Sequence, residues 1–322
     1  MDTPTNFSHY DLFNFSYDSD YDEDEFCDKG EVVIFGSIAI PIFFSLVIIL
    51  SLTGNILVLV ILALYENLKS PTNIFILNLA ISDLVFTTGL PFWAIYHVRG
   101  WVFSELLCKI VTFVFFMGFY SSILFLTIMT VYRYLAVVHP LSDLSTSKRS
   151  IGVFLSVLMW IISTAAAMPS LFFSSITSVH HKDKHSQGCE YSDPLWETVG
   201  VLQQNAFFLV AFAVMTFCYI KILGRFTRMK NRAVKFDFCR VVVFFLGWVP
   251  YNVVIFLRVL PAYGVTGLNE CKTSIQLDYA FYVCRLIAFS HCCLNPVFYA
   301  FVGVKFRSQC RLEFSSSQRS MY

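Results

Sequence analysis

The stretch CKIVTFVFFMGFYSSILFLTIMTVYRYLAVVH, residues 108–139, decides the fold. Between Lys109 and Arg133 it holds 23 residues without a charged side chain or a histidine. A helix needs about 20 such residues to cross roughly 30 Å of hydrocarbon, so this stretch is predicted to span a membrane. Cys108 and Arg133 would be separated by about 37 Å along the helix, which places them at opposite water interfaces.

Arg133 stands where the apolar run stops, between Tyr132 and Tyr134. An arginine at this depth can reach water, or it can be held inside the protein by a partner. It therefore either marks the end of a span or acts as an element with two positions. The stretch alone leaves both alternatives open.

The composition excludes a soluble protein. Of 322 residues, 57% are hydrophobic, 17% aromatic and 14% charged, which is typical of an integral membrane protein. The net charge of +1 hides an asymmetry, because residues 1–31 carry ten acids and one lysine, a charge of −9 that leaves +10 for the remainder. The two ends of the molecule are expected to face different partners.

Seven apolar runs with short polar connections predict seven membrane-spanning helices. Of 23 Lys and Arg residues, 15 fall on the side opposite the N-terminus, so the positive-inside rule places the N-terminus outside and the C-terminus in the cytoplasm. The first 30 residues are polar and show no cleavable signal. The runs cover residues 33–64, 72–97, 105–138, 149–172, 196–226, 234–260 and 275–302.

The N-terminal tail is acidic and rich in tyrosine. It is too polar to bury a core, so it is expected to be disordered alone. Its tyrosines lie among carboxylates, which favours a flexible anionic strap for a basic protein surface, although a tail that only adds solubility is the alternative. Asn6 and Asn14 begin glycosylation acceptor motifs. The strap comprises Tyr10, Tyr17, Tyr21, Asp22, Glu23, Asp24 and Glu25.

Several polar residues fall inside the apolar runs, where an unpaired polar group costs a few kcal/mol. Asp83, Ser122 and Asn295 together could hold a small cation such as sodium. A protonated aspartate in a hydrogen-bond network is the alternative. Asn55 and His291 are further polar positions in the first and last runs.

From residue 32 to 310 the chain resembles the rhodopsin-like (class A) G-protein-coupled receptors. Each motif alone is weak, but they occur in order and at the expected depths. The motifs are Gly54-Asn55, Leu79 to Asp83, Cys108, Arg133-Tyr134, Trp160, Tyr219, Trp248-Val249-Pro250 and Asn295-Pro296-Val297-Phe298-Tyr299.

Within that class the chain resembles the chemokine receptors. The resemblance rests on the acidic tail, WVPYN at residues 248–252 and AFSHCCLNPVFYAFVGVKFR at residues 288–307. The XC-type receptors for lymphotactin-like chemokines share SPTNIFILNL at residues 70–79, GCEYS at 188–192 and CRLIAFSHCC at 284–293. The CC-type receptors resemble the chain next most closely.

The resemblance implies an all-α seven-transmembrane helix bundle at residues 32–302, with an extracellular tail at residues 1–31. Residues 303–322 are expected to form a short amphipathic eighth helix and a cytoplasmic tail. The implied disulfides are Cys108–Cys189 and Cys27–Cys271. Besides the strap, the implied ligand-binding residues are Trp93, Tyr96, Phe115, Glu190, Tyr251, Asp278 and Arg285.

The resemblance also implies an activation switch, in which a chemokine outside the cell leads to activation of an inhibitory-class heterotrimeric G protein, calcium release and chemotaxis. Arrestin, membrane lipid and a homo- or heterodimer partner are further implied partners. Cys310 could carry a palmitoyl chain, and Ser315 to Ser317 and Ser320 could be phosphorylated. The switch residues are Tyr132, Arg133, Tyr134, Tyr219, Phe244, Trp248, Pro250, Asn295, Pro296 and Tyr299.

Several positions depart from the family pattern, and two of them bear directly on activation and ligand choice. Tyr132 stands where an acid usually pairs with Arg133, which predicts either higher basal activity or a hydrogen bond from the tyrosine instead. Arg285 stands where many chemokine receptors have a glutamate, so a cationic ligand N-terminus is expected to be poorly received.

Other classes fit less well. No nucleophile, base and orienting group stand at compatible depths for an enzyme, and no metal cofactor other than the sodium ion is expected. The last span has no lysine for a retinal Schiff base. One buried Asp makes a poor transport pathway. The remaining alternative is an atypical scavenger receptor that binds and internalises chemokine without activating a G protein.

Overall fold

The computed structural model describes residues 27, 29–66, 68–139, 149–181, 184–225, 232–265, 267–268 and 270–302. The helices are α1 Gly30–Tyr65, α2 Pro71–Arg99, α3 Glu105–Val138, α4 Arg149–Phe173, α5 Pro194–Arg225, α6 Arg232–Val259, α7 Cys271–Phe289 and α8 His291–Val302. Strands β1 Ser174–His181 and β2 Lys184–Tyr191 separate α4 from α5, and a 3-10 helix, Leu260–Tyr263, follows α6.

Seven segments of the described chain are long and apolar enough to cross a membrane, so the predicted seven-helix bundle is confirmed. The seventh span, Cys271–Phe298, joins α7 to α8 across a break at Ser290. Helix α8 is therefore the second half of that span. The amphipathic helix predicted after residue 302 lies outside the described residues.

Local signals in the sequence set where the helices begin and end. Pro71 occupies the start of α2, where its missing N–H costs nothing. Gly100 ends α2 with a φ of 74°, a conformation that suits glycine. Ser104 caps α3, because its hydroxyl accepts a hydrogen bond from the backbone N–H of Leu107 at 3.3 Å.

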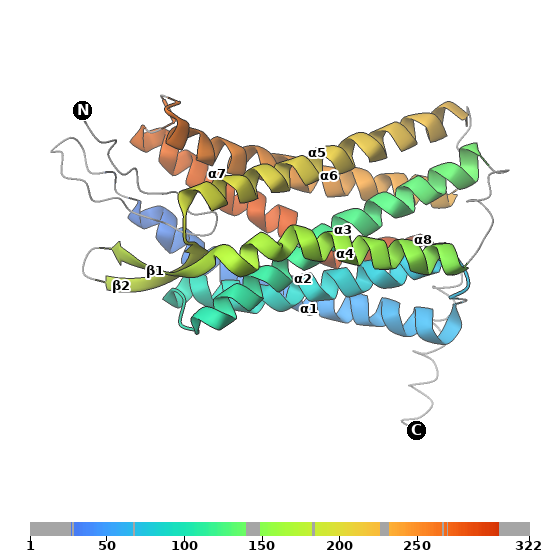
Figure 1. The fold of residues 1–322 in the computed structure, drawn as a ribbon, viewed down its shortest axis with the longest axis horizontal. Coiled ribbons are helices and arrows are strands. Elements are labelled where there is room, and N and C mark those ends of the chain that lie inside the picture. The colour runs from blue at the N-terminus through green and yellow to red at the C-terminus, as the bar shows by residue number, and fades with distance from the viewer. Residues whose placement is uncertain are drawn as a thin grey trace, which may run out of the picture.

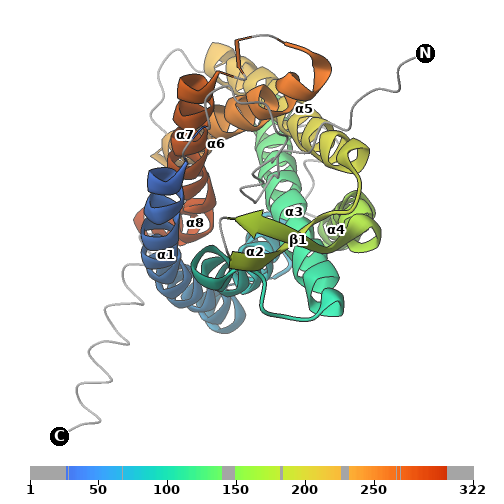
Figure 2. The same ribbon diagram turned by 90° about the vertical axis from the view of Figure 1, so that its left-hand side faces the viewer.

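The helices run along the long axis of the molecule, with α3 innermost (Figures 1 and 2). Helix α3 packs against α2, α4 and α5. Of the residues in its most apolar segment, 67% are buried inside the protein, compared with 22% for α4. The outward surface is apolar: Ile42, Phe154 and Leu246 are each at least 67% exposed. That pattern is expected where lipid takes the place of water.

A two-stranded antiparallel hairpin crosses one end of the bundle (Figure 2). Its register pairs Ser174 with Tyr191 and Ile176 with Cys189. The hairpin is an addition to the predicted all-α bundle, and sequence reasoning missed it because the strands are short and lie between spans whose hydrophobicity dominates the sequence pattern. We call this end the hairpin end, and the other the opposite end.

Close packing of α2 and α3 depends on Gly118. A Cβ atom at this position would lie 2.4 Å from the backbone nitrogen of Phe86 and 2.7 Å from its Cα. Because both are backbone atoms, no side-chain rotation can make room. Only glycine lets the two helices approach this closely.

We expect Gly118→Ala to destabilise the bundle by about 1–3 kcal/mol, the usual cost of overpacking a core. The matched control is Gly224→Ala in α5, where nothing lies within 4 Å of the added Cβ. Thermal unfolding of the detergent-solubilised protein measures both. Equal melting temperatures for the two variants would show that α2 and α3 accommodate the added methyl group without a loss of stability.

Candidate functional site

Two disulfides hold the hairpin end together, and both were predicted correctly. Cys108 at the start of α3 is bonded to Cys189 on β2, and Cys27 is bonded to Cys271, the first residue of α7. These bonds fix the hairpin and the entry to α1 to the bundle. In the hairpin, desolvation and the carboxylate of Glu197 raise the pKa of Tyr191 above its ordinary value.

A cluster of charges joins three helices next to the second disulfide. Asp278 of α7 accepts a hydrogen bond from Lys29 Nζ at 2.9 Å through Oδ2, and its Oδ1 lies 3.1 Å from Arg258 Nη1 of α6. Lys29 also donates to the hydroxyl of Ser274 at 2.6 Å. The three charged side chains are at most 16% exposed, so Asp278 acts as the internal counter-charge of two cations.

The structure buries the candidate ligand residues of the bundle. Each of the six is at most 5% exposed, and Glu190 on β2 is half-buried. A ligand that reaches these side chains must therefore displace groups already packed against them. The six residues are Trp93, Tyr96, Phe115, Tyr251, Asp278 and Arg285.

Arg285 is fully buried in α7 among aromatic rings. Its Nη1 lies 2.9 Å from Nε2 of His97. The centre of its guanidinium is 5.3 Å from the ring of Phe289 and 5.7 Å from the rings of Phe44 and Phe281. Ring faces attract a cation, and they supply part of the stabilisation that water would otherwise give.

Phe289, the last residue of α7, connects the candidate ligand residues to the predicted switch, and sequence reasoning did not identify it. It is 2% exposed and contacts residues of α3, α6 and α7. Its ring centroid is 5.3 Å from that of Phe115, 5.8 Å from Tyr251 and 6.1 Å from Trp248, and 5.3 Å from the guanidinium of Arg285. The signal available in the sequence was its place in the quoted AFSHCC motif.

Trp248 packs against Phe289 and lies in the turn of α6 that precedes Pro250. Its ring centroid is 4.6 Å from Phe119, 5.2 Å from His291 and 6.0 Å from Phe244. Pro250 has no N–H to bond the carbonyl of Leu246. The predicted switch residues Trp248 and Phe244 therefore both pack against His291, with ring centroids 5.2 Å and 6.0 Å from it.

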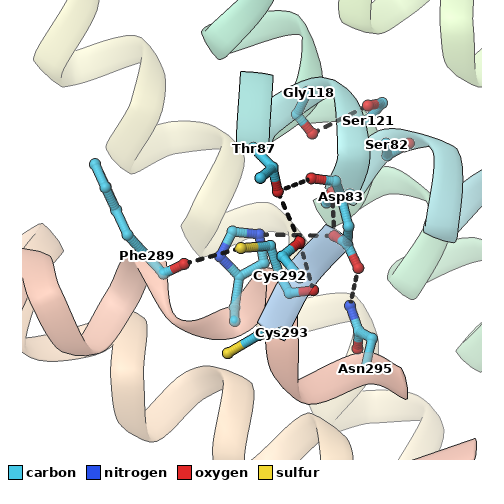
Figure 3. A network of polar contacts seen from close by, with 12 residues as sticks. Ser82, Asp83, Thr87, Gly118, Ser121, Phe289, Cys292, Cys293 and Asn295 are labelled. Atoms are coloured by element: carbon cyan, nitrogen blue, oxygen red, sulfur yellow. Dashed lines mark hydrogen bonds and ion pairs between the residues drawn. The ribbon is translucent and has the colours of Figure 1, made fainter. Parts of the chain in front are cut away.

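Asp83 forms the centre of a buried polar network (Figure 3). Its Oδ1 accepts a hydrogen bond from the hydroxyl of Ser122 at 2.9 Å, and its Oδ2 accepts one from Nδ2 of Asn295 at 2.7 Å. Nε2 of His291 lies 3.9 Å from Oδ1. The three residues suggested for a cation are thus in direct contact, with the carboxylate 0% exposed.

The network continues into α1. The hydroxyl of Thr87 donates to the backbone carbonyl of Asp83 at 2.6 Å and lies 2.7 Å from that of Ser51. Nδ2 of Asn55 donates to the carbonyl of Cys292 at 2.8 Å. Polar groups of α1, α2, α3 and α8 therefore satisfy one another inside the bundle.

At the opposite end, Tyr132 packs edge-on against Phe75 of α2, with ring centroids 5.8 Å apart. The hydroxyl of Tyr134 lies 3.1 Å from Nε2 of His139.

Helices α5 and α6 meet through Tyr219 and Phe238, whose ring centroids are 5.3 Å apart. Arg240 of α6 is buried and points toward α3, where its Nη2 lies 3.6 Å from Sδ of Met129. The side chain of Tyr299 lies outside the described residues. In this conformation the Arg240 side chain connects α6 to α3.

Comparison with known sequences places this bundle in a family. Residues 54–299 match the family described as 7 transmembrane receptor (rhodopsin family). The chain is 42% identical over 287 residues to chemokine XC receptor 1 of Homo sapiens, covering 88% of this chain and 83% of that receptor. The Mus musculus receptor of the same name is 41% identical over 285 residues, covering 87% and 84%.

A C-C receptor gives a similar match. C-C chemokine receptor type 1 of Homo sapiens is 39% identical over 324 residues, covering 97% of this chain and 88% of that receptor. The chain belongs to the chemokine receptors of the rhodopsin family. The predicted resemblance is confirmed, and with seven spans the receptor is a multi-pass protein of the plasma membrane.

Several predicted sites of the receptor lie outside the described residues. They are the strap residues Tyr10, Tyr17, Tyr21, Asp22, Glu23, Asp24 and Glu25, the predicted glycosylation positions Asn6 and Asn14, and the C-terminal positions Cys310, Ser315 to Ser317 and Ser320.

We expect Asp278→Asn to lower the stability of the receptor by about 1–3 kcal/mol, because Lys29 and Arg258 lose a shared and largely buried counter-charge. Thermal unfolding of the purified receptor measures the change. The control is Glu105→Gln, whose pair with Lys109 leaves the two side chains 56% and 32% exposed. We expect that control to change stability by less than about 1 kcal/mol, and an equal shift in both variants would contradict the structural role of Asp278.

Proposed function

We propose that this receptor binds a basic chemokine of the XC or C-C type outside the cell and activates a heterotrimeric G protein of the inhibitory class, which raises calcium and drives chemotaxis. The names of its relatives support the ligand class. The observation that carries the proposal is the position of Phe289. Its ring packs against the candidate ligand residues Tyr251 and Arg285 and also against Trp248 of the predicted switch.

The orientation supports this assignment. Fifteen of the 23 Lys and Arg residues lie on one side by sequence, so the hairpin end is proposed to face outward. Cys27 is bonded to Cys271 there, and the acidic tail consequently joins the bundle beside the cluster around Asp278. A negative tail attracts a basic protein over a distance of about one Debye length.

Signal passage is proposed to begin when a ligand's flexible N-terminus displaces contacts of Tyr251 or Arg285. Phe289 and Trp248 then repack, and α6 turns about Pro250 away from α3. Arg240 leaves Met129, and a cleft opens beside Arg133 for the G protein. Arrestin binding to phosphorylated Ser315 to Ser317, a palmitoyl chain on Cys310 and dimer formation belong to the same proposal.

The function is tested by adding a panel of XC and C-C chemokines to cells that express the receptor. We expect one or more of them to lower cyclic AMP and release calcium, with a weaker response after residues 1–26 are deleted. The cyclic AMP level of the same cells without chemokine tests whether Tyr132, in place of an acid beside Arg133, raises the basal activity of the receptor. Chemokine uptake without any change in cyclic AMP would support the scavenger alternative instead.

Neutralising the strap gives a sharper prediction. Replacing Asp22, Glu23, Asp24 and Glu25 with their amides should slow chemokine association by about tenfold or more at low salt, because electrostatic steering contributes about 10–10³-fold to such rates. The difference should shrink near 1 M salt, where the Debye length falls to about 3 Å. Surface plasmon resonance measures both rates.

The control for the strap exchanges each Asp for Glu and each Glu for Asp, which keeps the charge. Its association rate should match that of the native receptor. If the amide variant also associated at the native rate in low salt, capture by the tail would be excluded.

We further propose that Asp83, with Ser122 and Asn295, holds a sodium ion that modulates ligand affinity. The carboxylate and the Ser122 hydroxyl supply oxygen donors, while Asn295 must turn its amide oxygen, in place of Nδ2, toward the ion. Asp83→Asn should abolish any difference in chemokine affinity between sodium chloride and choline chloride of equal ionic strength.

Radioligand competition in the two salts measures this effect. The control is Ser121→Ala, because the Ser121 hydroxyl is also buried but donates to the carbonyl of Gly118 and not to Asp83. A sodium effect that persists in Asp83→Asn would remove the ion from this site.

A further inference from the structure

A cavity of about 420 Å³ lies between α5 and α6, in the half of the bundle nearer the opposite end. It includes none of the ligand residues discussed above, and its size falls within the range of about 300–1,000 Å³ usual for small-molecule sites. Its lining residues are Phe212, Thr216, Tyr219, Ile220, Leu223, Phe238, Val241, Val242, Phe245, Leu246, Val249 and Pro250.

The cavity has an interior wall and an open rim. Tyr219, Val241 and Phe245 are buried, whereas Ile220 and Leu246 are 62% and 69% exposed. The cavity is therefore a groove that is continuous with the outer apolar surface of two spans. The medium that meets this surface in a cell is the hydrocarbon of the membrane.

Aromatic rings on the two helices form contacts that bridge this region. The centroids of Phe212 and Phe245 are 4.7 Å apart, and those of Tyr219 and Phe238 are 5.3 Å apart. Because large planar rings separate the helix backbones, the smaller side chains Val242, Val249 and Thr216 leave space beside them. The side chains that line such a space lack dispersion contacts on one side, and an apolar occupant would restore them.

We propose that this groove binds one hydrocarbon chain of a membrane phospholipid. The lining is almost wholly carbon, and none of its side chains carries a formal charge, so an ionic ligand would be left unpaired at a cost of a few kcal/mol. A flexible chain needs no polar anchor inside the groove, since its headgroup stays at the membrane surface.

The occupant touches two residues of the predicted switch, because Tyr219 and Pro250 both belong to the wall. Binding of the chain itself does not depend on chemokine recognition or on G-protein activation. Its test therefore succeeds or fails independently of the proposed function.

Photolabelling tests the site. The full-length receptor is placed in nanodiscs of phosphatidylcholine that contain a phosphatidylcholine probe with a diazirine in the middle of one acyl chain. After irradiation, adducts are mapped by mass spectrometry. We expect adducts concentrated on the groove residues of α5 and α6, well above those on equally exposed positions such as Phe154 of α4 and Ile42 of α1.

Filling the groove should remove the adducts. Val242→Trp is expected to lower groove labelling by roughly fivefold, the ratio for a site weakened by about 1 kcal/mol. The control is Val253→Trp on the same helix, which is 50% exposed and does not line the groove. If Val242→Trp fails to give a folded receptor, Leu246→Trp fills the same space from the rim.

Two results would overturn the proposal. Adducts spread evenly over the outer faces of all spans, or unaffected by the groove-filling tryptophan, would show ordinary lipid contact without a site. Groove labelling that an excess of sterol removes, together with preferential labelling by a diazirine sterol, would assign the groove to a sterol and exclude the acyl chain.

Discussion

Polar groups inside a bilayer find no water, so the protein itself must satisfy them. This constraint sets the arrangement of the bundle, and Asp83 shows it most clearly. Its carboxylate takes a hydroxyl from α3 and an amide from α8, and the hydroxyls of Thr87 and Ser51 carry the network to α1. Four helices thus acquire a fixed relative position through one buried acid. The seven-helix architecture follows from hydrophobicity, whereas the positions of the helices relative to one another follow from buried polar groups such as Asp83.

The same constraint changes the role of the charges at the hairpin end. By sequence, Asp278 and Arg285 are candidate ligand contacts in the upper part of the seventh span. In the structure, Asp278 is already the counter-ion of Lys29 and Arg258, and Arg285 is held by His97 and three aromatic rings. A ligand gains little from either residue unless its own groups replace these partners. If these residues contact the ligand as proposed, selectivity would depend on how well an incoming chain competes with internal contacts, as well as on the sign of its charge.

Much of the fold was predictable because its signals are local. Long apolar runs gave the seven spans, and four cysteines in polar segments gave the two disulfides once the family was recognised. The hairpin strands were missed because eight-residue segments carry a weak periodic signal beside helices of about thirty residues. The partnership of Lys29 with Asp278 joins residues 249 positions apart, and no local pattern records which cation an acid will meet. Phe289 was missed for a similar reason, since one phenylalanine among 35 becomes distinctive only through its neighbours.

Under the proposed function, the position of Phe289 offers a route by which binding at one end would reach the middle of the bundle. It ends α7 immediately before the break at Ser290, so the helix has a joint at the residue that meets Tyr251, Arg285 and Trp248. Interiors at crystal-like density do not absorb a displaced ring by compression, and neighbouring rings must therefore change rotamer or move together. A rotation at the joint shifts His291 as well, which lies 5.2 Å from Trp248 and 3.9 Å from Asp83. Under the proposed mechanism, the aromatic contacts of Phe289 and the polar network around Asp83 would therefore respond together to a shift of this segment.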